Sequence, residues 1–229
     1  NRGFMRRMRD GVPLVAVKVG MTMDAKIALE TGASQWITSA AARADVQRLR
    51  AASGAIVTGV GTVLADDPAL TVRGNRFDNA GMQPLRVILD THLRSPSSSR
   101  IFREAGETLV FTASTDARRT EALQALGAVV ESCPVTAAGL DLEVILQRLA
   151  AREVNEVLVE AGPAVVGAFV RDHLFDDLVI YLAPKIFGNS ATGTFALPAL
   201  LNIDSATELE IVNVRKVGPD LRITMRSHR

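Results

Sequence analysis

Cysteine is nearly absent from this chain, in which Cys133 is the single thiol. One thiol cannot form a disulfide within the chain, and a sequence without disulfides is typical of the reducing cytoplasm, where we expect the protein to reside. The three histidines are scattered singly, so no pattern has the spacing of a zinc site and we expect no metal ion. Because no histidine is near Cys133 in the sequence, we expect this thiol to be packed rather than nucleophilic.

Net charge and long apolar runs are lacking as well. The 26 basic and 25 acidic residues leave a formal charge of +1, which removes the electrostatic basis for binding nucleic acid. No apolar run approaches the roughly 20 residues that span a bilayer, so no membrane span is expected. Hydrophobic residues make up 48% and charged residues 22% of the 229 residues, values typical of a globular protein with a substantial core.

Short apolar segments alternate with amphipathic ones along most of the chain. Strands are predicted at 14–19, 55–58, 85–89, 108–112, 128–131, 156–159 and 178–182, and helices at 41–52, 116–126, 140–151 and 164–171. This alternation predicts an α/β fold with a mostly parallel sheet that helices flank on both faces. Strands at 208–216 and 221–225, joined across Gly218-Pro219, predict a closing antiparallel hairpin. We expect one domain over residues 13–229, after a basic linker or leading helix at residues 1–12 that belongs to a longer protein.

The segment 157–168 holds the most informative local pattern. A buried strand stops at Gly162, and Pro163 suits the first position of the helix that follows. Such a turn presents backbone N–H groups and the positive end of the helix dipole at the carboxyl edge of the sheet, where phosphate binds well. The spacing is not GxGxxG, so a standard Rossmann fingerprint is excluded. An ordinary strand-to-helix turn stays open as the alternative.

Two charged residues are associated with predicted strands. Glu160 follows the strand at 156–159, at the edge where open α/β sheets bind ligands, although it could equally be a solvated strand end. Lys18 is a cation inside an apolar strand, and burying it without a partner would cost free energy. It is therefore expected either on an exposed face or pointing into a polar cavity.

Other candidate ligand contacts are two arginines and the single tryptophan. Arg50 and Arg73 could clamp a phosphate bidentately, although surface arginines are usually only solvated. Trp36 lies in a polar segment, which favours stacking on a planar ring over core filling. A glycine-bearing turn follows the strand at 55–58, and Asp66-Asp67-Pro68 is typical of a turn.

Several long motifs recur in a fixed order along the chain. They are Ser34-Gln35-Trp36-Ile37-Thr38, residues 62–73, Val159-Glu160-Ala161-Gly162-Pro163, Ala183-Pro184-Lys185 and Val217-Gly218-Pro219-Asp220. Together they resemble the reductase half of the bifunctional bacterial riboflavin-biosynthesis deaminase/reductase, over essentially the whole chain. The resemblance implies a dihydrofolate-reductase-like mixed sheet flanked by helices. The opening residues 1–4 look like the segment after the deaminase domain, which implies a fused deaminase in the full-length protein; the zinc-deaminase signature is absent here.

The resemblance also implies a reaction and a set of ligand contacts. The reaction is transfer of a hydride from NADPH to ribose C1′ of 5-amino-6-(5-phosphoribosylamino)uracil, which gives the ribitylamino product, in a protein expected to be a homodimer. Lys18 and Glu160 are implied as the residues that meet the base and the reacting sugar carbon. The implied substrate contacts are Ser34, Arg50, Leu70, Arg73 and Glu160. The implied cofactor contacts are Gly20, Trp36, Thr62, Asp66, Thr91, Gly162, Pro163, Ala164, Val165, Val166, Gly167 and Ala168.

Some features leave alternatives open. A dihydrofolate-reductase relative acting on a pterin would not need the phosphate-binding set of Ser34, Arg50 and Arg73, and a non-catalytic nucleotide-binding module would bind NADPH without turnover. Asp24-Ala25-Lys26 departs from the Asp-Gly-Arg usual in the family, which puts the conformation of this loop in doubt. We expect the site in a cleft between the strand end near Lys18, the segment 62–73 and the edge at 160–162. Donors for the 2′-phosphate are expected just after the strand at 85–89, at Thr91 and Arg94.

Overall fold

The computed structural model describes residues 1–73 and 82–227. The chain forms two compact units, here called unit 1 (Asn1–Leu14 and Gln47–Ala161) and unit 2 (Val15–Val46 and Gly162–Arg229). Helix α2 (Ala40–Ala52) contributes to both, because the division falls after Val46.

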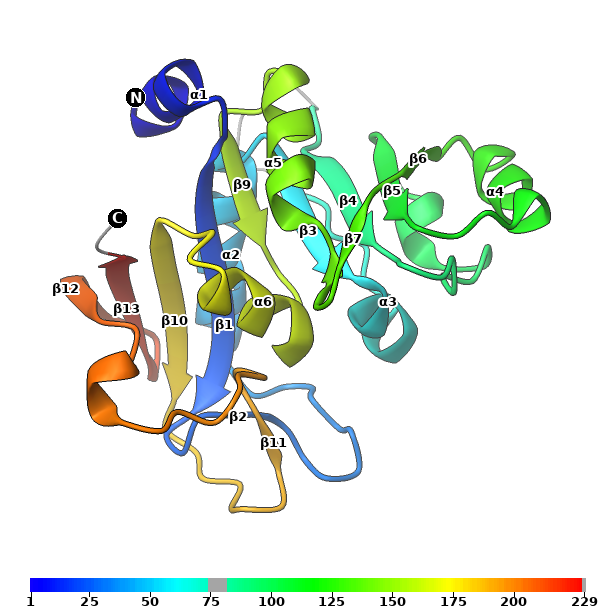
Figure 1. The fold of residues 1–229 in the computed structure, drawn as a ribbon. Helices are drawn as coiled ribbons and strands as arrows, with labels where there is room; N and C mark the ends of the chain where they lie inside the picture. Colours follow the sequence, from blue (N-terminus) through cyan, green and yellow to red (C-terminus); the bar gives the residue numbers. More distant parts are fainter. Residues whose placement is uncertain (74–81, 228–229) are drawn as a thin grey trace. The chain divides into compact units, whose positions relative to one another are not determined.

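Unit 1 is built on parallel strands. Their order is β9 (Glu156–Val159), β3 (Ala55–Gly59), β4 (Leu85–Leu89), β5 (Thr108–Thr112) and β6 (Val129–Ser132). All residues of β3 and β5 are buried, as expected of central parallel strands with few polar side chains. Helix α5 (Leu142–Ala151) lies in front of this sheet in Figure 1 and buries Ile145 and Leu149.

The remaining elements of unit 1 are short. They are α1 (Arg2–Asp10), α3 (Val60–Asp66), η1 (Arg100–Phe102), α4 (Ala117–Gln124), β7 (Val135–Thr136) and β8 (Gly139–Leu140). Side-chain caps fix where the helices begin: Asp116 accepts a hydrogen bond from the first turn of α4, and Asp141 does so for α5.

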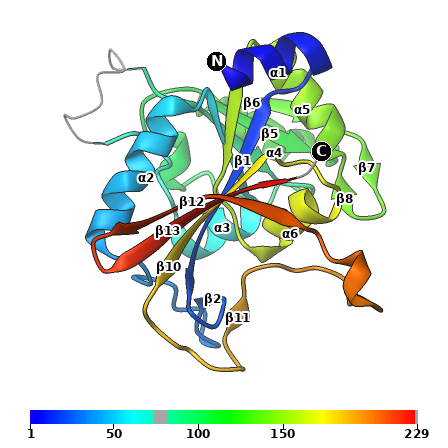
Figure 2. The ribbon, with the colours of Figure 1, turned by 90° about the vertical axis from the view of Figure 1, so that its left-hand side faces the viewer.

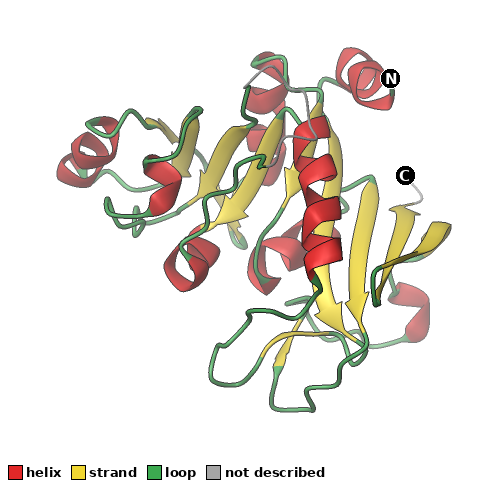
Figure 3. Ribbon diagram, turned by 180° about the vertical axis from the view of Figure 1, so that it is seen from behind, coloured by secondary structure: helices red, strands yellow, loops and turns green. Residues whose placement is uncertain are grey.

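Unit 2 combines parallel and antiparallel pairing. Strand β1 (Leu14–Thr22) runs parallel to β10 (Asp177–Ala183), which pairs antiparallel with β13 (Asp220–Ser227), and β13 pairs antiparallel with β12 (Leu209–Val217). Helix α6 (Pro163–Arg171) lies in front of β1 and β10 in Figure 1, and α2 is seen on the opposite face in Figure 3. Figure 2 shows the β12–β13 hairpin and the segment with η2 (Ile203–Ser205) that precedes it. A small ribbon joins β2 (Lys26–Ala28) to β11 (Thr192–Gly193).

The predicted fold class, an α/β fold with a mostly parallel sheet, flanking helices and a C-terminal antiparallel hairpin, is confirmed. The turn expected at Gly59–Gly61 is wrong in one respect, because α3 begins there. Gly61 lowers the helix propensity of this segment, but burial of Val60 and Val63 outweighs it, and Gly59 serves as the N-cap. The leading segment was expected to be either a linker or a helix, and residues 2–10 form a helix. The domain limits at 1–12 and 13–229 stay a prediction.

Within the described ranges, none of the helices is long and apolar enough to cross a membrane.

Candidate cofactor and substrate site

A buried ion pair in unit 1 joins α2 to the residue that follows β9. Arg50 donates from Nε to Glu160 Oε1 at 2.6 Å and from Nη2 to Glu160 Oε2 at 3.1 Å, while its Nη1 donates to the Thr71 carbonyl at 3.0 Å. The two side chains are only 10% and 8% exposed. Bidentate geometry and low exposure make this a strong and rigid contact.

The charge of each partner stabilises the charge of the other. Burial lowers the pKa of Arg50, but the neighbouring Glu160 carboxylate raises it by more, so the net shift of the pKa is upward. The Glu160 backbone N–H donates to the Val57 carbonyl at 2.9 Å, which continues the β3–β9 pairing past the end of β9. The family resemblance implied that Arg50 contacts the substrate phosphate and that Glu160, with Lys18, meets the base and the reacting sugar carbon. The structure joins Arg50 to Glu160 directly, and their roles with ligands stay predictions.

Two more predicted substrate residues lie on the segment that Arg50 holds. Leu70 is buried with a φ of 49°, and the next residue accepts the hydrogen bond from Arg50. Arg73 is exposed, and its backbone N–H donates to Gln47 Oε1 at 2.8 Å. Helix α2 therefore supports this segment at two points, through Arg50 at the Thr71 carbonyl and through Gln47 at the Arg73 N–H.

The loop after β4 contains Thr91 and Arg94, the residues expected to bind the 2′-phosphate. It also contains Asp90, which no pattern in the sequence indicated. Asp90 is fully buried and accepts from the Arg94 N–H at 2.9 Å and from both the N–H and the hydroxyl of Ser95 at 2.7 Å. This carboxylate shapes the loop, in which Thr91 is half-buried and Arg94 exposed. A cavity of about 400 Å³ lies beside it; its lining includes Arg94, Ser95, Ser97 and Arg119. Its donors are of the kind that bind phosphate oxygens.

Helix α3 carries the other two cofactor residues predicted in unit 1. It begins at Val60, its N-cap Gly59 provides no side-chain hydrogen bond, and Thr62 is half-buried while Asp66 is exposed. The following residue, Asp67, accepts a hydrogen bond from the Arg100 N–H at 2.8 Å and so ties the end of α3 to η1.

In unit 2, the first turn of α6 has the form expected of an anion site. Gly162 is the N-cap and provides no side-chain hydrogen bond, and Pro163 occupies the first turn. The residues from Gly162 to Val165 keep some exposure, whereas Val166 and Gly167 are buried. A Cβ on Gly167 would collide with the Ala196 backbone, so close packing within the protein accounts for this glycine without a cofactor.

The predicted residues on β1 and in the loop after β2 lie elsewhere in unit 2. Lys18 is half-buried on β1, in register with Val179 of β10. A Cβ on Gly20 would lie 3.2 Å from Thr38 Cγ2, so this glycine permits a close approach of the loop. Ser34 is half-buried. The expected cleft combines residues of unit 1 and unit 2, and it stays a prediction.

Trp36 is 62% exposed and therefore not part of the core, as its polar surroundings predicted. The Arg43 guanidinium carbon lies 4.2 Å from the centroid of the Trp36 ring, and Lys185 Nζ donates to the Trp36 carbonyl at 2.7 Å. No local pattern in the sequence shows that the Arg43 side chain lies over the indole.

The loop with the unusual Asp24-Ala25-Lys26 sequence is held by its aspartate. Asp24 accepts from the Thr22 hydroxyl at 2.5 Å and from the Gly188 N–H at 2.7 Å. The Thr22 hydrogen bond lowers the pKa of Asp24 most; burial opposes it, and the net pKa is about 2. Ala25 adopts a φ of 56°, in the left-handed region that glycine prefers. The loop thus keeps a glycine-type conformation although it has lost the glycine.

A second polar cluster in unit 2 was missed from the sequence. Asp45 on α2 is buried and accepts from the Tyr181 hydroxyl at 2.8 Å, from Arg215 Nη2 at 2.8 Å and from Arg222 Nη1 at 3.1 Å. These bonds tie α2 to β10, β12 and β13. Within the described part of the chain, no group of three or more His, Cys, Asp or Glu side chains is placed to hold a metal ion.

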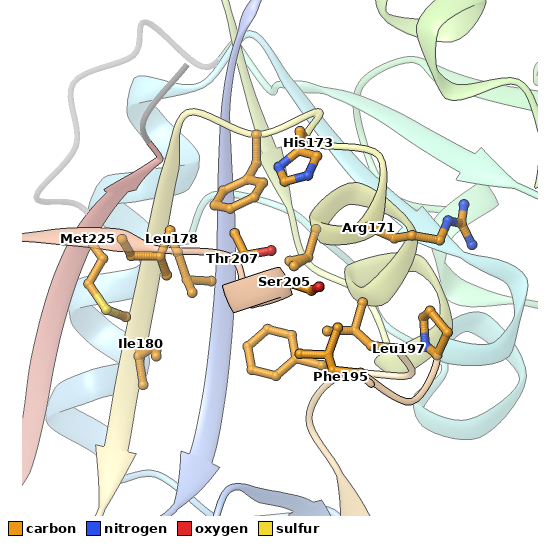
Figure 4. A pocket seen from close by; sticks show the side chains of 14 residues that line it. Arg171, His173, Leu178, Ile180, Phe195, Leu197, Ser205, Thr207 and Met225 are labelled. Carbon is orange, nitrogen blue, oxygen red and sulfur yellow. The ribbon is translucent and has the colours of Figure 1, made fainter. Parts of the chain in front are cut away.

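Unit 2 also contains an apolar groove of about 390 Å³, shown in Figure 4. Its lining comes from the end of α6, from β10 and β13, and from the segment between β11 and β12. The labelled side chains include Leu178, Ile180, Phe195, Leu197 and Met225. The lining is mostly apolar, with Arg171 and His173 as its ionisable members, and it suits an apolar partner better than a phosphate.

Comparison with known proteins identifies the family. Residues 13–223 match the family model described as the RibD C-terminal domain. The riboflavin biosynthesis protein RibD of Escherichia coli K12 is 39% identical over 231 residues, which cover 96% of this chain and 62% of that protein. The chain thus spans less than two thirds of the length of this relative.

Solved structures agree. RibD of Acinetobacter baumannii matches with a TM-score of 0.89 and 32% identity, over 100% of this chain and 62% of that one. The diaminohydroxyphosphoribosylaminopyrimidine deaminase/5-amino-6-(5-phosphoribosylamino)uracil reductase of Thermotoga maritima matches with a TM-score of 0.81 and 31% identity, over 99% and 60%. The resemblance drawn from the sequence is confirmed, and the chain belongs to the RibD C-terminal domain family.

Proposed function

We propose that this chain reduces 5-amino-6-(5-phosphoribosylamino)uracil with NADPH, as the reductase step of riboflavin biosynthesis. The observation that carries the proposal is the family match over residues 13–223, together with the reductase activity named for the Thermotoga maritima protein that shares its fold. The buried pair of Arg50 and Glu160 supports it, because it places charged groups at the carboxyl edge of β9, where ligands bind in open α/β sheets.

The residues present fit a dinucleotide cofactor. The first turn of α6 begins at Gly162 without a side-chain cap, and backbone N–H groups at such a turn bind pyrophosphate oxygens. Arg94 and Ser97, with Arg119, line a cavity suited to the 2′-phosphate that distinguishes NADPH from NADH. NADPH supplies the hydride when bound. The protein contributes binding, orientation and the exclusion of water.

Proton transfer and substrate orientation fall to Lys18 and Glu160. The bidentate contact with Arg50 favours the charged form of the Glu160 carboxylate, which suits it to orient the substrate by accepting a hydrogen bond. Lys18 is then the candidate donor as the ribose ring opens. We expect Lys18→Ala and Glu160→Gln to lower kcat more than they raise the KM for NADPH, in steady-state assays that vary one ligand at a time.

The direct test is consumption of NADPH with freshly generated substrate. Loss of NADPH absorbance that requires the phosphoribosylaminouracil, with the ribitylamino product identified by mass spectrometry, would support the proposal. If purified protein oxidises no NADPH under these conditions, the proposed activity is wrong. Competitive inhibition by ribose 5-phosphate would favour a phosphorylated substrate, whereas turnover of dihydrofolate would favour a pterin reductase. NADPH binding without turnover of either would indicate a non-catalytic module.

The phosphate-binding residues have their own test. Arg50→Ala should weaken substrate binding and spare NADPH affinity, which calorimetry with each ligand can separate. Because Arg50 also holds Glu160, we expect kcat to fall as well. Arg73→Ala is the comparison, since the Arg73 side chain is exposed and should affect the substrate KM alone. Equal loss of both ligands in Arg50→Ala would show that this division of the site is wrong.

We also propose that the chain forms a homodimer through β12. This outer strand is exposed along nearly its whole length, including Ile211 and Val214, and Leu201 and Ile203 nearby are 97% and 90% exposed. Exposed apolar patches of this kind mark interfaces, and an antiparallel pairing of two outer strands is self-complementary about a twofold axis. Light scattering should give the dimer mass for the wild type and the monomer mass for Val214→Lys. A wild-type monomer would contradict the proposal.

The full-length protein is proposed to carry a fused deaminase, since the Thermotoga maritima protein named for both activities is matched over only 60% of its length. Deaminase activity of the native protein from its source, measured beside that of this chain, tests the point. Residence in the cytoplasm stays a prediction.

A further inference from the structure

Arg43 and Trp36 form a stack that the sequence alone did not reveal. The Arg43 guanidinium lies 4.2 Å from the centroid of the indole, well inside the range of about 6 Å for a cation–π contact. Its Nη1 also donates to the Thr38 carbonyl at 2.7 Å, which restrains the guanidinium plane. Lys185 holds the Trp36 carbonyl at 2.7 Å, so the ring and its backbone are both restrained.

Neither residue is where folding alone would place it. Trp36 is 62% exposed, so much of its surface forgoes the burial that makes an indole useful in a core. Arg43 lies in the first turn of α2, where the helix dipole disfavours a cation and no acidic residue of that turn compensates, although the Asp220 carboxylate accepts from the Ser39 N–H at 2.8 Å just before the helix. The two unfavourable placements meet in one contact, which indicates that the contact serves a ligand.

We propose that Arg43 is a positioning residue that holds Trp36 as a preformed platform for a planar ring of the pyridine-nucleotide cofactor. The proposal rests on the proposed function, because the cofactor is NADPH. A guanidinium covers one side of an indole, and the high exposure of Trp36 leaves most of the remaining ring surface open for stacking. A ring fixed in advance loses less conformational entropy on binding than one that must be ordered by the ligand.

The chain offers a direct spectroscopic readout, because Trp36 is its only tryptophan. Indole-selective emission therefore reports this one side chain. Arg43→Gln should lower the emission anisotropy of Trp36 and make it more accessible to acrylamide, since the ring loses its restraint. Arg48→Gln is the matched control: Arg48 lies on the same helix, is exposed, and should leave both signals unchanged.

Cofactor binding is measured separately, by calorimetry and by quenching of Trp36 emission with NADPH. Arg43→Gln should weaken NADPH binding by about two- to fivefold, the range expected for one cation–π contact at an exposed site. Arg43→Lys keeps the charge without the planar stack and should restore part of the affinity. In a Trp36→Leu background, Arg43→Gln should have no further effect, because its action passes through the indole.

The outcomes separate this proposal from the proposed function. If the wild type binds and oxidises NADPH while Trp36 emission stays unchanged, the platform is wrong and the reductase activity stands. Wild-type NADPH affinity in Arg43→Gln, or an equal loss in the Trp36→Leu background, would also overturn it. Failure of the wild type to bind NADPH would reject both, while acrylamide quenching still reports whether the stack exists. Circular dichroism and melting of Arg43→Gln and Arg48→Gln check that both are folded.

Discussion

Two arginines roughly two turns apart on helix α2 meet opposite environments. Arg50 is buried and pairs bidentately with the equally buried Glu160. Arg43 lies over the exposed ring of Trp36 and donates one hydrogen bond to a backbone carbonyl. At one end of the helix an arginine, Arg50, is buried against an opposite charge. At the other end an arginine, Arg43, lies beside an exposed aromatic ring.

The difference follows from the dielectric surroundings of each guanidinium. A buried charge costs free energy unless an opposite charge or several hydrogen bonds compensate it, so breaking the Arg50–Glu160 contact is costly and the contact keeps its geometry. At a partly exposed site water already solvates the charge, and the weaker attraction of an indole face is enough. The closed contact therefore suits a fixed chemical group such as a catalytic carboxylate. The open one suits recognition of a ring.

The largest effect should come from removing the buried arginine. We expect Arg50→Met to lower the free energy of unfolding by about 3–5 kcal/mol, because the buried Glu160 carboxylate then loses its bidentate contact with the Arg50 guanidinium. Urea unfolding followed by circular dichroism measures the change. Arg43→Met is the matched control on the same helix and should change stability by less than about 1 kcal/mol.

The double variant Arg50→Met with Glu160→Leu sharpens this test. Replacing both charges with apolar groups should recover most of the stability lost in the single variant, while activity stays abolished. If Arg50→Met and Arg43→Met destabilise the protein equally, the contrast between the two ends of α2 is wrong.

Local patterns predicted much of the fold but only part of the site. The strands at 85–89, 108–112 and 156–159 have the predicted bounds, because central parallel strands are short apolar runs that a sequence shows directly. The start of α6 was predicted from Gly162 and Pro163, whose preferences act at the position where they occur.

Contacts between distant segments could not be predicted in this way. Arg50 and Glu160 are 110 positions apart, so their pairing depends on where α2 and β9 lie in the fold. Asp45 lies in a helix among alanine and arginine, where an acidic residue usually faces solvent, yet its partners come from β10, β12 and β13. Ala25 was identified as unusual from the sequence, but its positive φ became visible only in the structure.

Asp45, between the two arginines on α2, provides a test of intermediate size. Burial raises its pKa, but the hydrogen bonds from Tyr181 and Arg215 and the charge of Arg222 lower it more, so the net shift is downward. The folded protein therefore binds this proton less readily than the unfolded chain. The stabilisation is present above the unfolded pKa, near 3.8, and is lost as the pH falls below it.

Replacing this carboxylate should have two effects. Asp45→Asn should lower the free energy of unfolding near neutral pH by about 1–3 kcal/mol, because buried hydrogen bonds to a charged acceptor are lost. It should also flatten the fall in stability between about pH 5 and pH 3, as followed by urea unfolding across that range. Asp116→Asn, at the exposed cap of α4, is the control. An unchanged pH dependence in Asp45→Asn would argue that this carboxylate does not supply the acid sensitivity.

The smallest expected effect on stability concerns backbone strain at Ala25, which lies in unit 2 with Trp36 and Arg43. Ala25 has a φ of 56°, which an L residue with a Cβ adopts at a cost that glycine avoids. Ala25→Gly should therefore raise the free energy of unfolding by about 0.5–1 kcal/mol, after allowance for the greater freedom of glycine in the unfolded chain. Ala33→Gly, in a nearby loop at a residue that does not itself have a positive φ, should be neutral or slightly destabilising.

The gain in stability expected for Ala25→Gly should not alter the position of the Trp36 ring. Asp24 ties this loop to Thr22, Phe187 and Gly188, so the loop is expected to keep its shape when the backbone strain is relieved. The acrylamide quenching of Trp36 in Ala25→Gly should therefore equal that of the wild type, while the unfolding free energy rises. An equal gain in Ala33→Gly would show that backbone strain at Ala25 is not the cause. A change in quenching would mean that the strained loop helps to set the position of the indole. The Arg43–Trp36 contact would then depend on its surroundings more than the contrast with Arg50 implies.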